Sequence, residues 1–209
     1  MSVLDKIAHF QERRNEVPNQ ELARQLVQEE DYEGIREIAE NLWNKEAKIQ
    51  ADCIKVLYEI GYLKPELIAA YASSYVKLLR SRNNRLVWGG MIALSTVAQV
   101  AASELEAHVP EIQRVMQRGS VITVDAGVIT LASIASTSPT RGESIFPYLL
   151  QHLRTCRPKD VSQHSEKILT AVTSENKSVF IQILERRLPD LSEAQAKRVR
   201  KVIKEAGTR

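Results

Sequence analysis

Aromatic residues, glycine, proline and cysteine are all scarce in this chain of 209 residues. Phe, Trp and Tyr together make up 5% of it, beside 8 Gly, 7 Pro and 2 Cys. The scarcity of glycine and proline argues against an all-β fold, which needs many tight turns. Cys53 and Cys156 lie far apart in unrelated contexts. They form no metal-ligand motif and indicate a reduced, cytoplasmic setting.

Long apolar runs and catalytic motifs are also missing. No uninterrupted apolar run reaches the roughly 18–20 residues that cross a bilayer, and the charged N-terminus does not read as a secretory signal. The histidines are scattered, without an HExxH motif or a second histidine in ligand spacing; they are His9, His108, His152 and His164. We therefore expect no membrane association, no metal, no cofactor and a non-catalytic protein.

What the chain does contain is a repeat with a period of 37 residues. Leu57, Leu94 and Leu131 follow one another at this interval, and the segments around them share one pattern of large and small residues. Apolar stripes predict pairs of helices, named A and B, in each repeat. The A helices are expected at 31–43, 66–80, 104–118, 142–155 and 175–188. The B helices are expected at 46–61, 84–101, 121–136, 159–173 and 191–206.

Two features of these helices carry a family resemblance. Pro110 and Pro147 occupy equivalent A-helix positions, and the run RLVWGGMIALSTVA (85–98) alternates small residues with Leu, Ile and Val. In both respects residues 31–206 resemble HEAT repeats, an armadillo-type family of helical hairpins. The usual Asp of the intra-repeat turn and Arg of the B helix are not regular here. The resemblance implies an all-α, right-handed α-α superhelix, that is, a solenoid.

The expected domain organisation follows from this resemblance. About five HEAT-like hairpins would form a single domain over 1–209, with 1–30 as a polar N-terminal helical cap. HEAT proteins serve mostly as scaffolds, although a few are enzymes. Gly90 and Gly127 fall in register inside B helices, where glycine costs about 1 kcal/mol relative to alanine. We expect them to permit close approach of neighbouring helices.

The B helices of such a stack normally line its concave face. Asp52 and Lys55 should be exposed there, as should Gly89 and Ala126, and the middle two repeats are unusually poor in charge. Exposed apolar patches mark interaction sites, and tryptophan is a favoured anchor. The sequence thus predicts a scaffold that binds a protein partner through this face; the alternative is that its tryptophan belongs to the core. The predicted partner-binding residues are Trp88, Ile92, Ser95, Asp125 and Ile129.

A second predicted surface is a basic ridge at the turns between A and B helices. Residues 1–66 hold 9 basic and 14 acidic side chains, whereas 67–209 hold 20 and 12. Arginines beside helix N-termini can bind phosphates, so nucleic-acid binding is the alternative function. Bases at A-helix C-termini also simply complement the helix dipole. The ridge comprises Arg80, Arg82, Arg85, Arg118, Arg154, Arg157 and Lys159.

A more specific form of this alternative uses Trp88 and Asp125. Alkylpurine DNA glycosylases built on HEAT-like repeats have a concave aromatic and acidic pocket with basic residues around it. Trp88 and Asp125 occupy equivalent positions in adjacent repeats, but neither Trp43 nor Trp88 has a carboxylate one helical turn away. The similarity is therefore to a type of surface and not to a catalytic motif.

Overall fold

The computed structural model describes residues 2–209, and every regular element in that range is helical. The described chain divides into two compact units, the first ending at Gly127 and the second running from Val128 to Arg209. The boundary falls inside α8 (Val121–Ala135). The all-α architecture expected from the repeat is confirmed, while the single domain stays a prediction. None of the helices in the described range combines the length and apolar character that a membrane span requires.

The first unit contains two complete helical hairpins. One consists of α2 (Tyr32–Glu40) and α3 (Ala47–Leu63), and the next of α4 (Ala72–Leu78) and α5 (Asn84–Val97). Helix α3 packs along α5, so the B helices of consecutive repeats are neighbours. Their shared core includes the fully buried Leu57 and Leu94. Short 3-10 turns complete the hairpins: η2 (Asn41–Trp43), η3 (Pro65–Leu67) and η4 (Ala69–Tyr71).

The equivalent prolines have different effects on their two A helices. The helix expected at 104–118 is divided into α6 (Ala102–Leu105), η5 (Glu106–His108) and α7 (Val109–Arg118), with Pro110 in the first turn of α7. A proline at that position loses no hydrogen bond, because the first N–H groups of a helix have no partner within it. In α9 (Pro139–Thr155), by contrast, Pro147 lies inside a continuous helix.

The in-register glycines lie where helices approach each other closely. A Cβ atom on Gly90 would be 3.0 Å from the Leu78 Cβ and 3.1 Å from the Tyr75 carbonyl oxygen, both on α4. On Gly127 it would be 2.5 Å from Met116 Cγ. Close approach, the expected reason for these glycines, is therefore confirmed.

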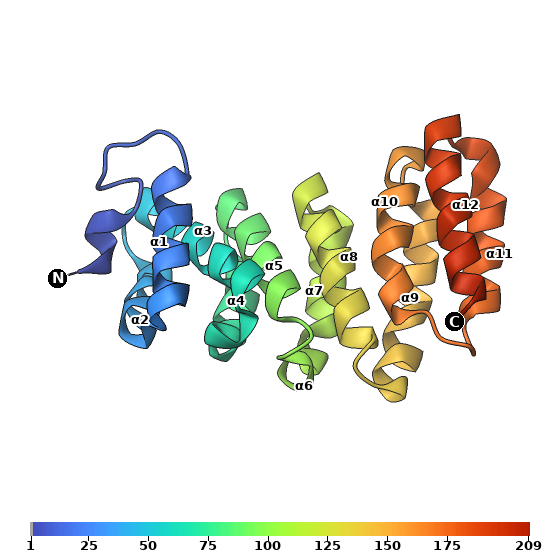
Figure 1. Ribbon diagram of the computed structural model, residues 1–209, viewed down its shortest axis with the longest axis horizontal. Coiled ribbons are helices and arrows are strands. Elements are labelled where there is room, and N and C mark those ends of the chain that lie inside the picture. The colour runs from blue at the N-terminus through green and yellow to red at the C-terminus, as the bar shows by residue number, and fades with distance from the viewer. Residues whose placement is uncertain (1) are drawn as a thin grey trace. The chain divides into compact units, whose positions relative to one another are not determined.

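The N-terminal segment covers part of the face that the sequence predicts to be open. Helix α1 (Val17–Glu29) lies along α3 (Figure 1), and η1 (Val3–Lys6) and a loop precede it. The Asp52 carboxylate accepts hydrogen bonds from the His9 backbone N–H at 2.8 Å and from Asn19 Nδ2 at 2.9 Å. Asp52 and Lys55 are only 9% and 7% exposed, so their predicted exposure is wrong.

The second unit contains two further hairpins. Helix α9 pairs with α10 (Pro158–Ile168), and α11 (Lys177–Arg187) pairs with α12 (Glu193–Gly207), while α10 packs along α12. Phe146 and Phe180 are buried in its core. Two 3-10 turns extend these helices: η6 (Leu169–Ala171) and η7 (Leu188–Asp190). These positions match the predicted A and B helices of the last two repeats.

Candidate interaction surface and a histidine–cysteine cluster

Trp88 lies on the surface of α5, one turn from the start of the helix. Asn83 caps α5 by accepting a hydrogen bond from the Arg85 backbone N–H at 3.0 Å. The Arg85 guanidinium lies over the Trp88 ring, 6.0 Å from its centroid. Trp88 and Ile92 are both partly exposed, and Ser95 donates its hydroxyl hydrogen bond to the Ile92 carbonyl at 2.7 Å. The tryptophan is therefore half-buried, with an exposed part beside a cation.

The remaining predicted partner-binding residues lie on α8. Asp125 and Ile129 are one helical turn apart and both partly exposed, but Asp125 belongs to the first unit and Ile129 to the second. Gly89 and Ala126 are buried, which contradicts their predicted exposure. Gly89 is buried because its Cα faces the Ile54 side chain of α3, where an added Cβ would lie at 3.0 Å.

A carboxylate of the chain itself occupies the basic end of the α3–α5 face. Glu16 pairs with Lys55 Nζ at 3.1 Å and with Arg85 Nη2 at 2.9 Å. Lys55 also contacts Glu59 at 2.6 Å and lies 4.8 Å from the Tyr58 ring centroid. Burial opposes the charge on Lys55, but hydrogen bonds to Glu59, Tyr58 and Glu16 outweigh it and raise the lysine pKa. This end of the face therefore binds an acidic group.

A cavity of about 500 Å³ adjoins this ion pair in the first unit. The loop before α1, the start of α3 and the start of α5 form its walls. Its lining carries both signs of charge, because Arg13, Arg14 and Lys48 line it together with Glu12 and Asp52. Glu16 and Arg85 are themselves part of the lining, together with mainly polar side chains. A segment bound here would therefore contact mainly polar groups.

The predicted basic ridge is partly neutralised within the first unit. Arg80 holds Glu111 through two contacts, at 2.5 and 2.7 Å, and this hydrogen bonding lowers the pKa of Glu111. Arg85 is engaged with Glu16, as described above. Arg82 and Arg118 are exposed and make no ion pair within residues 2–127.

The ridge residues of the second unit are also only partly neutralised. Arg157 pairs with Asp160 at 2.6 Å, and Arg154 contacts the Gln151 side chain at 3.4 Å. Lys159 is exposed and has no ion pair among the described residues of this unit. Anion binding by the ridge would thus rest on the four of its seven members that make no ion pair within the described residues of their own unit; they are Arg82, Arg118, Arg154 and Lys159.

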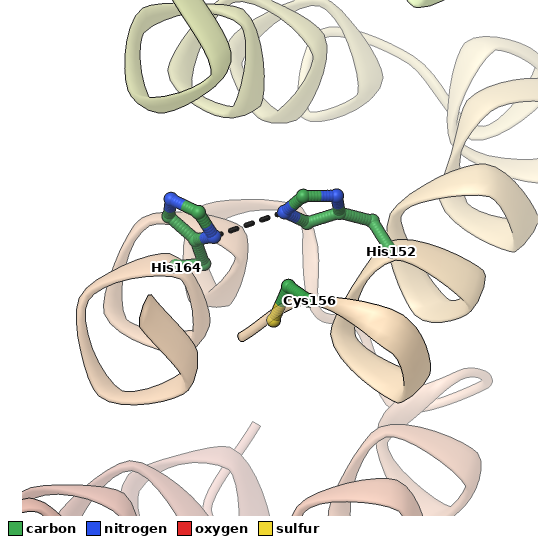
Figure 2. A group of neighbouring side chains, drawn as sticks. All are labelled: His152, Cys156 and His164. Carbon is green, nitrogen blue, oxygen red and sulfur yellow. Dashed lines mark hydrogen bonds between the residues drawn. The ribbon is translucent and has the colours of Figure 1, made fainter. Parts of the chain in front are cut away.

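Three potential metal ligands meet at the hairpin turn of α9 and α10. His152 lies in the last turn of α9, Cys156 is its C-cap, and His164 lies on α10. His152 Nε2 and His164 Nδ1 are 2.9 Å apart, and the ligand atoms of all three residues lie within 4.8 Å of one another. Figure 2 shows the two imidazoles facing each other with Cys156 alongside. The expectation that the histidines are scattered is wrong for this pair.

Arg187 of α11 fixes the backbone around this cluster. Its guanidinium donates hydrogen bonds to the carbonyl oxygens of Leu153 and Cys156, and its Nε pairs with Asp190 at 2.9 Å. These carbonyls lie at the C-terminus of α9, which carries partial negative charge. Burial raises the pKa of the Cys156 thiol, whereas the Arg187 guanidinium opposes that rise.

A second cavity, of about 560 Å³, lies in the second unit at the start of α9. Its apolar lining includes Phe146, Pro147, Leu150 and Val179. The sequence pattern does not reveal this groove, because these residues also fit the buried stripe of a helix.

Comparison with known proteins identifies the class of fold. No family model matches the sequence, and no curated protein matches it. A designed armadillo repeat protein in complex with a (KR)4 peptide superposes with a TM-score of 0.71 and 14% identity, over 90% of this chain and 86% of that one. An engineered protein superposes with a TM-score of 0.70 and 15% identity, over 100% and 98%. The chain therefore has the helical repeat fold of armadillo and HEAT proteins.

Proposed function

We propose that this protein is a non-catalytic scaffold that binds a protein partner through the B-helix face formed by α3 and α5. Trp88 and Ile92 would contact apolar side chains of the partner, and Lys55 and Arg85 would bind an acidic one. The observation that carries the proposal is the Glu16 carboxylate held between Lys55 and Arg85, next to Trp88.

The chemistry of this face favours an extended acidic segment. Tryptophan and arginine are the residues most enriched among binding hot spots, and here they lie in contact. The designed armadillo neighbour was solved with a basic peptide. On the present face Lys55 and Arg85 hold the Glu16 carboxylate between them, so we infer the opposite preference. The predicted contributions of Ser95, Asp125 and Ile129 stay predictions, as does a cytoplasmic location.

In this proposal Glu16 is an internal competitor for the partner's carboxylate. An incoming Glu or Asp would replace it between Lys55 and Arg85, and Glu16 would return to solvent. Lys55 and Arg85 pair with a carboxylate both before and after the exchange, so the change in ion pairing contributes little. The apolar contact with Trp88 must therefore supply most of the net affinity. Salt should therefore weaken binding modestly, whereas loss of the indole should weaken it strongly.

Fluorescence anisotropy with two labelled peptides tests the proposal. One peptide alternates Glu and Leu over ten residues, and the other alternates Lys and Leu. Trp88→Ala should weaken binding of the acidic peptide about tenfold or more, and Arg85→Met should also weaken it. Glu16→Gln should strengthen it. Arg82→Met removes an exposed arginine in the turn before α5, outside the B-helix face, and is the matched control. Equal binding of both peptides, or an unchanged affinity in Trp88→Ala, would refute the proposal.

Nucleic-acid binding through the ridge stays the second candidate, because Arg82 and Arg118 are exposed and make no ion pair within the first unit. A labelled DNA duplex titrated at two salt concentrations distinguishes it. Binding through phosphates should fall by orders of magnitude between low and high salt and should weaken with Arg82→Glu. Glycosylase activity on alkylated DNA would be assayed only if the duplex binds.

A further inference from the structure

We propose that His152, Cys156 and His164 form a binding site for a transition-metal ion, with Zn²⁺ as the expected occupant. Two imidazole nitrogens and one thiol sulfur from the two helices of one hairpin meet within 4.8 Å (Figure 2). His152 and Cys156 are four positions apart at the end of α9, so both project on the same side of the helix. His164 reaches the same point from α10.

The observed distances are close to those of a tetrahedral site. Zn–N bonds of about 2.0–2.1 Å and Zn–S bonds of about 2.3 Å require ligand separations of roughly 3.3 Å between nitrogens and 3.6 Å between nitrogen and sulfur. The two nitrogens, at 2.9 Å, must move apart by a few tenths of an ångström. The sulfur, which lies within 4.8 Å of both nitrogens, must move inward by up to about 1.2 Å, which rotation of the Cys156 side chain can supply.

The donor set selects the kind of metal. Thiolate and imidazole ligands suit Zn²⁺ and its first-row neighbours, whereas Mg²⁺ and Ca²⁺ require oxygen ligands. Zinc has no geometric preference of its own and accepts three protein ligands plus a water molecule or an exogenous group. The site would thus keep one position open, on the partly exposed side of His152 and Cys156.

Burial explains why this cluster is more than a surface coincidence. His164 is only 1% exposed, and a buried imidazole needs a polar partner. One role for the cluster is a hydrogen bond between the two rings, in which a single proton is shared. The other role is metal ligation, in which both facing nitrogens present lone pairs to the ion. The nearby Cys156 thiol adds a third ligand that a simple histidine pair does not need.

The charge around the site is compatible with a cation. Arg187 lies beside Cys156, but its guanidinium is engaged by Asp190 and by the carbonyls of Leu153 and Cys156. These contacts fix the C-terminal end of α9 and the backbone of Cys156, which begins the turn between α9 and α10. The thiolate would neutralise one charge of Zn²⁺, and the thiol proton would be released to solvent on binding.

Cobalt titration of the tag-free, chelator-treated full chain is the direct test. Co²⁺ should bind one-to-one and give both the d–d bands of a tetrahedral site and a sulfur-to-cobalt charge-transfer band, and Zn²⁺ should displace it. Cys156→Ser should abolish the charge-transfer band. His152→Asn should weaken the affinity at least about tenfold. Cys53→Ser and His108→Asn are the matched controls, and both should bind like the wild type.

Thiol alkylation gives a second readout that does not depend on the cobalt spectrum. Zn²⁺ should slow alkylation of Cys156 and leave the fully buried Cys53 unchanged. His152 is partly exposed, so its Asn variant should fold even if His164→Asn does not; circular dichroism checks this. Absence of the charge-transfer band in the wild type, or equal metal affinity in Cys156→Ser, would overturn the proposal. The cluster would then be a hydrogen-bonded histidine pair.

Discussion

Two glycine-to-alanine substitutions should change the stability of this protein in opposite directions. On Gly61 of α3, an added Cβ would lie 2.1 Å from Thr96 Oγ1 and 2.7 Å from Thr96 Cβ on α5. Rotation of the threonine can move its oxygen, but its Cβ is fixed by the backbone, so the two helices must separate. Overpacking of this kind costs about 1–3 kcal/mol, against a helix-propensity gain of about 1 kcal/mol. The difference is a net loss of up to about 2 kcal/mol, and the 2.7 Å contact with the fixed Thr96 Cβ places the expected value at the upper end.

Gly142 of α9 is the matched control. Its added Cβ would meet only the Ala135 carbonyl oxygen, at 3.4 Å, which is an ordinary contact. Alanine there should stabilise the protein by about 0.5–1 kcal/mol, because glycine loses more backbone entropy on folding. The same glycine-to-alanine substitution should thus lower the free energy of unfolding at Gly61 and raise it at Gly142. The direction depends on how closely the neighbouring backbone and side chains approach the glycine.

Urea unfolding measures both effects. Trp43 and Trp88 lie in the first unit, so tryptophan fluorescence follows that unit, while circular dichroism follows all helices. Gly61→Ala should lower the midpoint of the fluorescence transition with an unchanged slope. Gly142→Ala should leave that midpoint unchanged and raise the midpoint of the circular dichroism transition, to which the second unit contributes. If Gly61→Ala stabilised the first unit as much as Gly142→Ala stabilises the second, the inferred approach of α3 and α5 would be refuted.

Two further predictions concern the buried groups of α3. Burial, reinforced by Asp52 and Glu37, raises the pKa of Cys53 to about 12 from an ordinary value of 9.0. The neutral thiol therefore contributes stability that is complete below pH 9 and is lost as the pH rises toward 12. Relative to Cys53→Ala, the wild type should lose about 1.4 kcal/mol of unfolding free energy per pH unit in that window, and parallel curves would contradict this. Asp52→Ala removes the acceptor of one buried and one partly buried N–H group, so trypsin should cleave after Arg13 and Arg14 at least about tenfold faster. An unchanged rate would show that other contacts hold the N-terminal segment.

The repeat register predicts the fold well because the register is a packing constraint. Leu57, Leu94 and Leu131 are all fully buried, since a position that faces the core in one repeat faces it in the next. Gly90 follows the same logic, because close helix approach recurs with the period. The fold class and the helix pairs could therefore be predicted from sequence alone.

Exposure on the B-helix face could not be predicted in the same way. Lys55 occupies a repeat position whose equivalents Ile92 and Ile129 are partly exposed, yet it is buried because Glu16, in the segment before α1, pairs with it. That segment lies outside the repeat, so no periodicity indicates where it packs. The signal that could have located it is the polar composition around Asn19, whose side chain hydrogen-bonds both Asp52 and the Ala8 backbone.

The histidine–cysteine cluster lies where the repeat is interrupted. The turn TCRPKD (155–160) is one residue longer than its equivalents, which displaces the fourth B helix by one position. With that shift, His164 takes the register position of Asp52, Gly89 and Ala126. Each of those is either small or fully hydrogen-bonded, because the position is buried in every repeat. A histidine there requires a polar partner, and His152 lies 12 residues before it, an interval that corresponds to no fixed helical spacing. Only the crossing of two helices brings the rings together, so the sequence shows the interruption but not the contact.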